Sequence, residues 1–126
     1  MSITFGRKFF EEHMQYLSNK DAAGMVKNTY TKDAILYNAF PFMETPPPNV
    51  VKSQEELIKA FNAYLDYQGE LQVNSLYNFL ETKDVISFQA TITSPKTGNW
   101  AVGDTWVLQS GKIARHFGFA HRLEGL

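Results

Sequence analysis

The chain has 126 residues, enough for one domain with a single hydrophobic core. Its content of 44% hydrophobic and 20% charged residues is that of an ordinary soluble globular protein. A net charge of −1 argues against a nucleic-acid-binding surface, and the lack of cysteine excludes disulfides, thiolate metal sites and a cysteine nucleophile. We therefore expect a single domain over residues 1–126.

The N-terminal segment does not have the pattern of a signal peptide, because charged residues such as Arg7, Lys8 and Glu11 interrupt it. No apolar run approaches the ~20 residues that a membrane-spanning helix needs. We expect a cytoplasmic protein that does not act on a membrane.

The first part of the chain is helical in character. Apolar residues between Phe9 and Leu17 recur at the spacing of one helix face. Asp21 is a suitable N-cap for a second, short helix over residues 22–30. The β-branched and aromatic residues that follow predict a first strand over about 34–39.

Residues 41–51 contain four prolines, so we expect a rigid loop there and neither a helix nor a central strand. A third helix is predicted after this loop. Ser53 and Glu56 have the spacing of a capping box at its start, and Gly69 ends it. The buried stripe of this helix is formed by Leu57, Ile58, Phe61, Tyr64 and Leu65.

The second half of the chain is predicted to consist of four strands, over about residues 71–80, 84–93, 99–109 and 112–121. Short segments with turn residues separate them, which predicts an antiparallel meander. The fold class is therefore α+β, with N-terminal helices packed on a curved antiparallel sheet. The expected order is two helices, a strand, a helix and four strands.

Three segments of the sequence resemble the nuclear transport factor 2-like superfamily, which includes ketosteroid isomerases and SnoaL-like polyketide cyclases. They are "YLSNKDAAGMVKNTYTKDAILYN", "KSQEELIKAF" and "GDTWVLQSGKIARHFGF". The resemblance implies a cystatin-like cone with a pocket at its wide end, and a homodimer formed through the outer face of the sheet. The superfamily includes several enzyme classes and binding modules, so the fold alone does not determine the chemistry.

The last hairpin has two possible registers. A two-residue turn pairs Gln109 with Lys112, whereas a three-residue loop ending in a left-handed Gly111 pairs Leu108 with Lys112. We prefer the three-residue loop because it places large residues opposite small ones throughout.

The preferred register places Asp104 directly opposite His116 on the inner face of the sheet. It also turns a set of apolar side chains outward, and a patch of this kind suggests a partner. The outward set consists of Val107, Ile113, Phe117 and Phe119, with Thr105 and Arg115 facing each other as its polar part.

Asp104 lies between Trp100 and Trp106 in a predicted strand, where a buried carboxylate needs a partner. By position it resembles the acid that ketosteroid isomerases keep protonated in an apolar site. The alternative is a buried acceptor that is bonded to His116 or to a backbone amide. The position of the isomerase general base holds Asn38, whose amide cannot take up the proton, so steroid isomerase activity is not expected.

Asp104, His116 and His13 are the candidate catalytic residues. Histidine titrates near neutral pH, and His13 lies where the resemblance places a phenolic donor. No metal site or cofactor is expected, because no ligands occur at short metal-binding spacing. The expected pocket lining is Tyr16, Tyr37, Asn38, Phe40, Phe61, Tyr64, Trp100, Val102 and Trp106.

Three functions agree with this pattern. The first is an enzyme that acts on a small, largely apolar carbonyl or hydroxyl compound as an isomerase, cyclase or dehydratase. The second is a non-catalytic protein that binds a small hydrophobic molecule, and the third is a dimeric interaction module with a filled cone. A cavity of ~300 Å³ or more that reaches Asp104 and His116 would favour the first two.

Overall fold

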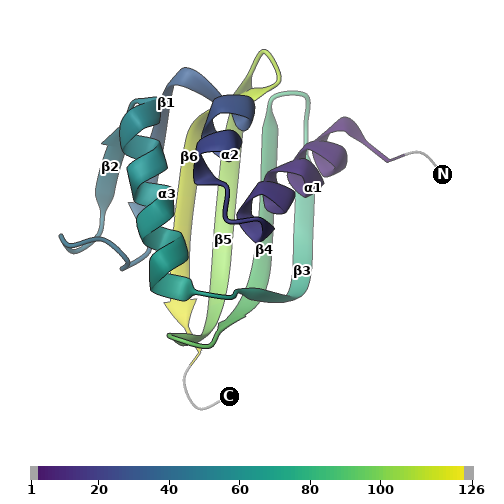
Figure 1. Cartoon of the computed structure of the whole chain (residues 1–126). Helices are drawn as coiled ribbons and strands as arrows, with labels where there is room; N and C mark the ends of the chain where they lie inside the picture. Colours follow the sequence, from purple (N-terminus) through teal and green to yellow (C-terminus); the bar gives the residue numbers. More distant parts are fainter. Residues whose placement is uncertain (1–2, 124–126) are drawn as a thin grey trace.

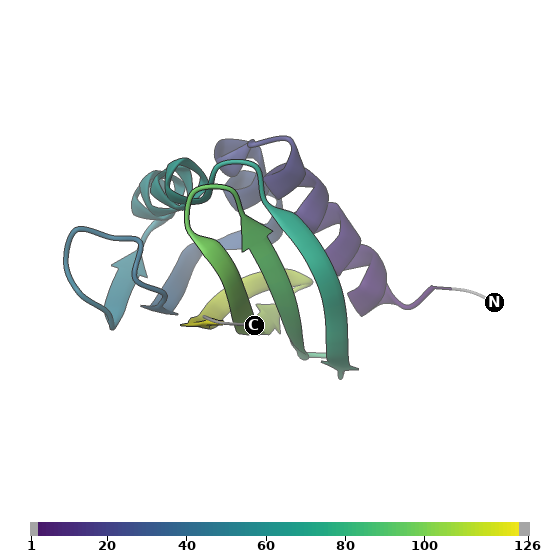
Figure 2. The ribbon, with the colours of Figure 1, turned by 90° about the horizontal axis from the view of Figure 1, so that it is seen from below.

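The structure, a computed structural model, describes residues 3–123 as three helices packed on one face of a six-stranded sheet (Figure 1). The sheet curves around the helices, as the view from below shows (Figure 2). This is the predicted α+β cone. The elements are α1 (Phe5–Ser18), α2 (Ala22–Thr29), β1 (Tyr30–Ala39), β2 (Asn49–Lys52), α3 (Gln54–Gln68), β3 (Gln72–Glu81), β4 (Val85–Ser94), β5 (Gly98–Gln109) and β6 (Lys112–Arg122).

The helix boundaries follow their capping residues. Asp21 caps α2 and Ser53 caps α3, and each side chain accepts a hydrogen bond from the backbone N–H three residues later, at 2.9 and 3.3 Å. Gly69 follows α3 with a φ of 69°, as predicted. Helix α1 begins earlier than its apolar spacing indicated, at Phe5, because Thr4 provides an N-cap. Within residues 3–123 no helix is long and apolar enough to cross a membrane.

The strand order is β2-β1-β6-β5-β4-β3, and strands β3 to β6 form the predicted antiparallel meander. The sheet differs from the prediction in two respects. Strand β2 was expected to be loop, but the prolines at 46–48 precede it and leave its single ladder with β1 intact. Strands β1 and β6 pair in parallel, so the sheet is mixed.

The β5–β6 hairpin has a two-residue turn, so the preferred three-residue register is wrong. Gln109 pairs with Lys112, and both turn residues, Ser110 and Gly111, have positive φ values of 53° and 77°. Positive φ at both positions is typical of the tight turns that match the twist of a hairpin.

A bulge near the turn then shifts the register again, between the pairs Leu108–Ile113 and Val107–Arg115. Neither predicted register therefore holds along the rest of the hairpin. Beyond the bulge Asp104 lies opposite Gly118 and His116 lies opposite Trp106. His116 faces inward, as Asp104 does, because the extra residue changes the face of β6.

Because of the bulge, the residues on the outer face of the sheet differ from the predicted set. Ile113 lies on the turn side of the bulge and is fully buried in the core, so it does not belong to the outward set. Thr105 lies opposite Phe117 and not opposite Arg115, and its hydroxyl group contacts Ser87 at 3.1 Å.

The hydrophobic core lies between the helices and the inner face of the sheet. Trp106, Tyr30, Met25, Leu57 and Ile86 are fully buried there. A smaller second cluster at the other end of the sheet is formed around Phe40, Ile92 and Trp100. The two clusters are joined through the region that contains the candidate site.

Candidate functional site

A cavity of about 120 Å³ lies between the helices and the sheet. It is smaller than the ~300 Å³ set as the lower limit for a typical ligand pocket, yet the cone is not filled. Most of its wall is apolar, with a few polar side chains. The lining is Phe10, His13, Met14, Leu17, Leu36, Asn38, Phe40, Phe42, Phe61, Tyr64, Leu71, Val73, Leu76, Phe88, Ala90, Ile92, Val102, Asp104, Trp106, His116, Gly118 and Phe119.

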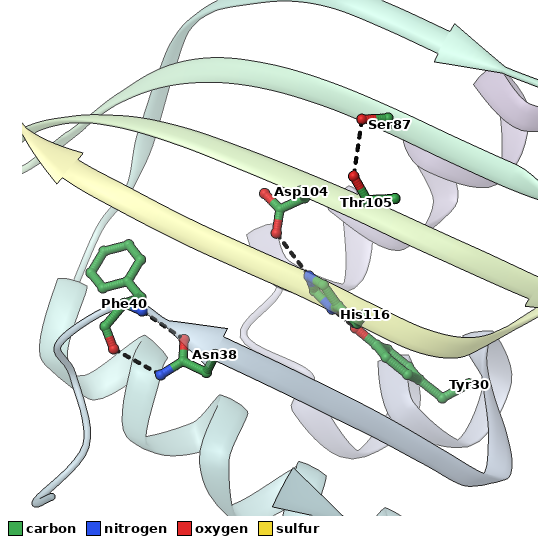
Figure 3. Close-up of polar contacts among 7 residues, drawn as sticks. All are labelled: Tyr30, Asn38, Phe40, Ser87, Asp104, Thr105 and His116. Carbon is green, nitrogen blue, oxygen red and sulfur yellow. Dashed lines mark hydrogen bonds and ion pairs between the residues drawn. The ribbon is translucent and has the colours of Figure 1, made fainter. Parts of the chain in front are cut away.

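Three polar side chains from different elements form a hydrogen-bonded chain at this wall. The Tyr30 hydroxyl group lies 2.8 Å from Nδ1 of His116, and Nε2 of His116 lies 2.7 Å from Oδ1 of Asp104. Figure 3 shows the three residues in a row, starting at the α2–β1 junction and ending on β5. Tyr30 and His116 are buried, whereas 22% of the Asp104 side chain is exposed.

With Asp104 as a carboxylate, the direction of the bond at its end of the chain follows, because the proton between Nε2 and Oδ1 must come from Nε2–H of His116. Burial, and then the charge of Asp104, raise the pKa of Tyr30 well above its usual value, so its phenol keeps the O–H. This O–H donates to Nδ1 when the His116 ring carries one proton, and the phenol oxygen accepts from Nδ1–H when the ring carries two. In both forms Asp104 accepts a hydrogen bond, unlike a protonated acid that donates one.

The second oxygen of Asp104 is open to a ligand. No residue among 3–123 donates a hydrogen bond to Oδ2, and Figure 3 shows it turned away from His116. Because Asp104 lines the cavity, this oxygen is the strongest hydrogen-bond acceptor that the apolar wall offers.

Gly118 provides the space in which Asp104 and His116 meet. A Cβ atom at this position would lie 2.9 Å from Oδ1 of Asp104 and 3.4 Å from Nε2 of His116. Any side chain would therefore displace the hydrogen bond. Sequence reasoning missed this role, although an isolated glycine inside a strand is a signal for close approach.

His13 is a neutral acceptor on the helix side of the cavity. The Thr29 hydroxyl donates to the Met25 carbonyl at 2.6 Å, so its oxygen accepts from Nδ1–H of His13 at 3.3 Å. This leaves the lone pair of Nε2 free. Burial, and then the nearby His116, lower the pKa of His13 well below 6.5.

Tyr64 provides a donor in the cavity wall. Burial, and then the charge of Asp104, raise the pKa of Tyr64, so its phenol also keeps its proton. The indole N–H of Trp106, by contrast, is buried away from the cavity and has no hydrogen-bond partner among residues 3–123, which costs about 1–3 kcal/mol. The cavity thus combines the acceptors Asp104 and His13 with the donor Tyr64.

Asn38 holds a turn together, and this use occupies both N–H donors of its amide. Its Nδ2 donates to the Phe40 carbonyl at 2.8 Å and to Oδ1 of Asn49 at 3.0 Å, and its own Oδ1 accepts from the Phe40 N–H at 3.0 Å. The side chain thereby fixes Phe40 at the cavity (Figure 3), and through Asn49 it connects β1 to β2.

Three residues of the expected lining lie outside the cavity. Tyr37 points to the outer face, because its position in β1 has the opposite parity to Asn38, and it stacks on Phe117 at 4.8 Å. Trp100 belongs to the second apolar cluster, and Tyr16 packs against the core from α1. The other expected residues, which line the cavity together with His13, Asp104 and His116, are Asn38, Phe40, Phe61, Tyr64, Val102 and Trp106.

Tyr30 is a further site residue that sequence reasoning missed, because it was assigned to the end of a helix and not to the first position of β1.

Residues 3–123 contain no group of three or more histidine, cysteine or acidic side chains that could hold a metal ion.

Solved structures share this fold. A nuclear transport factor 2-like protein from Anabaena variabilis matches 98% of this chain and 95% of its own, with 14% identity and a TM-score of 0.73. A candidate SnoaL-like polyketide cyclase from Mesorhizobium loti matches 89% and 96%, with 20% identity and a TM-score of 0.56. An uncharacterized cystatin-fold protein from Novosphingobium aromaticivorans matches 94% and 99%, with 11% identity and a TM-score of 0.70.

No protein-family model and no curated protein matches the sequence. The structural likeness shows that the chain has the nuclear transport factor 2-like fold, as its sequence resemblance implied. At these identities the likeness establishes the fold and not the chemistry.

The substitution Gly118→Ala tests the space requirement at the Asp104–His116 contact. We expect it to lower the free energy of unfolding by about 1–3 kcal/mol, as overpacking does, and to break the hydrogen bond. Urea unfolding and the NMR signals of the His116 ring nitrogens measure the two effects. In an Asp104→Ala background the same substitution should cost less, because the colliding oxygen is gone. An equal cost in both backgrounds would contradict this role.

His13 makes stability depend on pH. Its folded-state pKa lies below the unfolded value, so the unfolded chain binds the proton more readily and stability is lost as pH falls below about 6.5. We expect His13→Gln to reduce the loss between pH 7 and pH 5, by up to about 1.4 kcal/mol per pH unit. Urea unfolding at several pH values measures the slope, and His121→Gln, at an exposed position of β6, is the matched control. Equal slopes in wild type and His13→Gln would refute the assignment.

Proposed function

We propose that the chain is a small-molecule pocket protein of the SnoaL-like type, which binds a compact, largely apolar carbonyl or hydroxyl compound and moves a proton on it through Asp104. The observation that carries the proposal is a carboxylate with one oxygen held by His116 and the other open to an apolar cavity. In such a cavity an open carboxylate is both a binding group and a base.

The proposed reaction class is proton abstraction beside a carbonyl group. Oδ2 of Asp104 takes the proton, the C–H bond breaks, and its electron pair moves to the carbonyl oxygen as an enolate. The O–H of Tyr64 is the donor available to stabilise that oxygen. Return of the proton from Asp104 to another carbon gives an isomer. When a hydroxyl group on the β-carbon leaves instead, it takes up this proton and departs as water, which gives a dehydration.

The contacts of His116 favour a positioning role over the acid/base role first considered for it. Both of its ring nitrogens are occupied, by Tyr30 and by Asp104, so neither is free for a substrate. The ring holds the carboxylate in place and leaves the proton transfer to Asp104. His13 has a free Nε2, which makes it a further acceptor for a substrate hydroxyl group.

The alternative is a non-catalytic protein that binds the same class of compound. It uses the same cavity and the same polar wall, so it differs only in the outcome at the bound molecule. The filled-cone module has less support, because a cavity of about 120 Å³ remains in the cone.

The homodimer implied by the family resemblance belongs to the proposal. Its support is the outer face of the sheet, where Phe117, stacked on Tyr37, is 39% exposed and Phe119 is 58% exposed. Val50 at the neighbouring edge is also exposed and extends this aromatic patch. Burial of such a patch against a second copy would remove apolar surface from water.

Hydrogen–deuterium exchange tests the proton transfer. Cyclohexane-1,2-dione, a one-ring compound with carbonyl and enol hydroxyl groups, is incubated in D₂O and its exchange is followed by NMR. We expect the wild type to accelerate exchange next to the carbonyl, and Asp104→Asn to lower the acceleration by roughly 10²–10⁴-fold, because the amide cannot take up the proton. Asp66→Asn, the same change at an exposed position of α3, should match the wild type.

Equal exchange by the wild type and Asp104→Asn would contradict catalysis by Asp104. Saturable binding without accelerated exchange would leave the non-catalytic alternative in place of the enzyme.

Phe117→Glu tests the proposed dimer. A charge in the aromatic patch should shift the mass in solution from two chains to one, because the dimer would have to bury the carboxylate. Light scattering after size-exclusion chromatography measures this mass. Phe5→Glu, at an exposed phenylalanine on α1, is the matched control and should retain the wild-type mass. A monomeric wild type would contradict the proposal.

A further inference from the structure

The size of the cavity limits the ligand to about one six-membered ring. Its volume is about 120 Å³, and an apolar cavity of ~150 Å³ in another protein holds a single benzene molecule. The rings of Phe10, Phe61 and Phe88 in the wall suit a flat or compact ring. A second fused ring would have to extend beyond this volume toward the open side of the cavity.

The polar wall of the cavity selects a group that donates a hydrogen bond. Oδ2 of Asp104 has no donor among residues 3–123, and Asp104 lines the cavity. A hydroxyl group supplies such a donor.

We infer that the ligand is a monocyclic hydroxyl compound, a phenol, cyclic enol or cyclic alcohol, whose O–H donates to Asp104. This inference rests on the pocket of the proposed function and narrows its compound class; for the proposed proton transfer the compound also needs a carbonyl group, as in the keto form of a cyclic enol.

Other small groups fit the wall less well. A ketone or ether has only acceptors and leaves Oδ2 of Asp104 without a donor. A carboxylate would place a second negative charge beside Asp104. An ammonium group carries three donors, and to enter the cavity it must give up its hydration for the few acceptors there, which are chiefly Asp104 and His13.

The test measures the affinities of phenol, anisole, toluene and 2-naphthol for the whole chain by NMR titration. Phenol has a donor and an acceptor, anisole only an acceptor, and toluene neither. We expect phenol to bind more tightly than anisole, and 2-naphthol to bind more weakly than phenol because of its second ring. These comparisons use the wild type alone and so do not depend on the folding of a variant.

The variant Asp104→Asn sharpens the test. Because Tyr30 fixes the Nε2–H of His116, the Asn oxygen should take the place of Oδ1, and its NH₂ group then replaces the open acceptor with a donor. We expect phenol affinity to fall roughly tenfold or more, the loss of a hydrogen bond to a charged group, while toluene affinity changes less than about twofold. Asp66→Asn should behave like the wild type.

Each contrary outcome has a distinct meaning. Equal affinities for phenol and anisole, or tighter binding of 2-naphthol, would overturn the inference, while exchange that depends on Asp104 would still support the proposed function. Failure of all four compounds to bind would overturn the inference, and the absence of exchange as well would overturn the proposed function.

Discussion

The candidate site depends on one constraint, which is that a carboxylate in an apolar cavity must be held by hydrogen bonds. The bond from His116 to Asp104 meets this need at one oxygen, and Tyr30 fixes the imidazole that makes it. The open oxygen then faces the cavity as an acceptor that is oriented before a ligand arrives. Without the chain from Tyr30, the imidazole could present either nitrogen to the carboxylate, and the direction of the bonds would be lost.

The fold supplies this arrangement through a few local devices. The bulge in the last hairpin brings His116 to the inner face and sets it diagonally across from Asp104, and Gly118 leaves the space between them. The start of β1 places Tyr30 behind the imidazole, because β1 pairs with β6 in parallel. Residues from the first and last parts of the chain thus meet because β1 and β6 are neighbouring strands in the mixed sheet.

The sequence was sufficient to predict the elements whose signals are local. The caps at Asp21 and Ser53 and the turn-separated strands of the meander all determine their structure within a few residues. The inward orientation of Asp104 followed from strand parity. The register did not, because a bulge leaves no clear mark in a sequence, and neither did Tyr30, whose role depends on a partner 86 residues away. The volume of the cavity is a small difference between large packed volumes, so no residue pattern reports it.

The central claim is the chain in which His116, held at Nδ1 by Tyr30, donates from Nε2–H to the carboxylate of Asp104. The most direct measurement is the nitrogen-15 NMR spectrum of the His116 ring near neutral pH, in the wild type and in Tyr30→Phe. The account predicts a protonated Nε2 in the wild type and a hydrogen bond at Nδ1 that is lost in Tyr30→Phe. A bare Nε2, which would make Asp104 the donor, would contradict it.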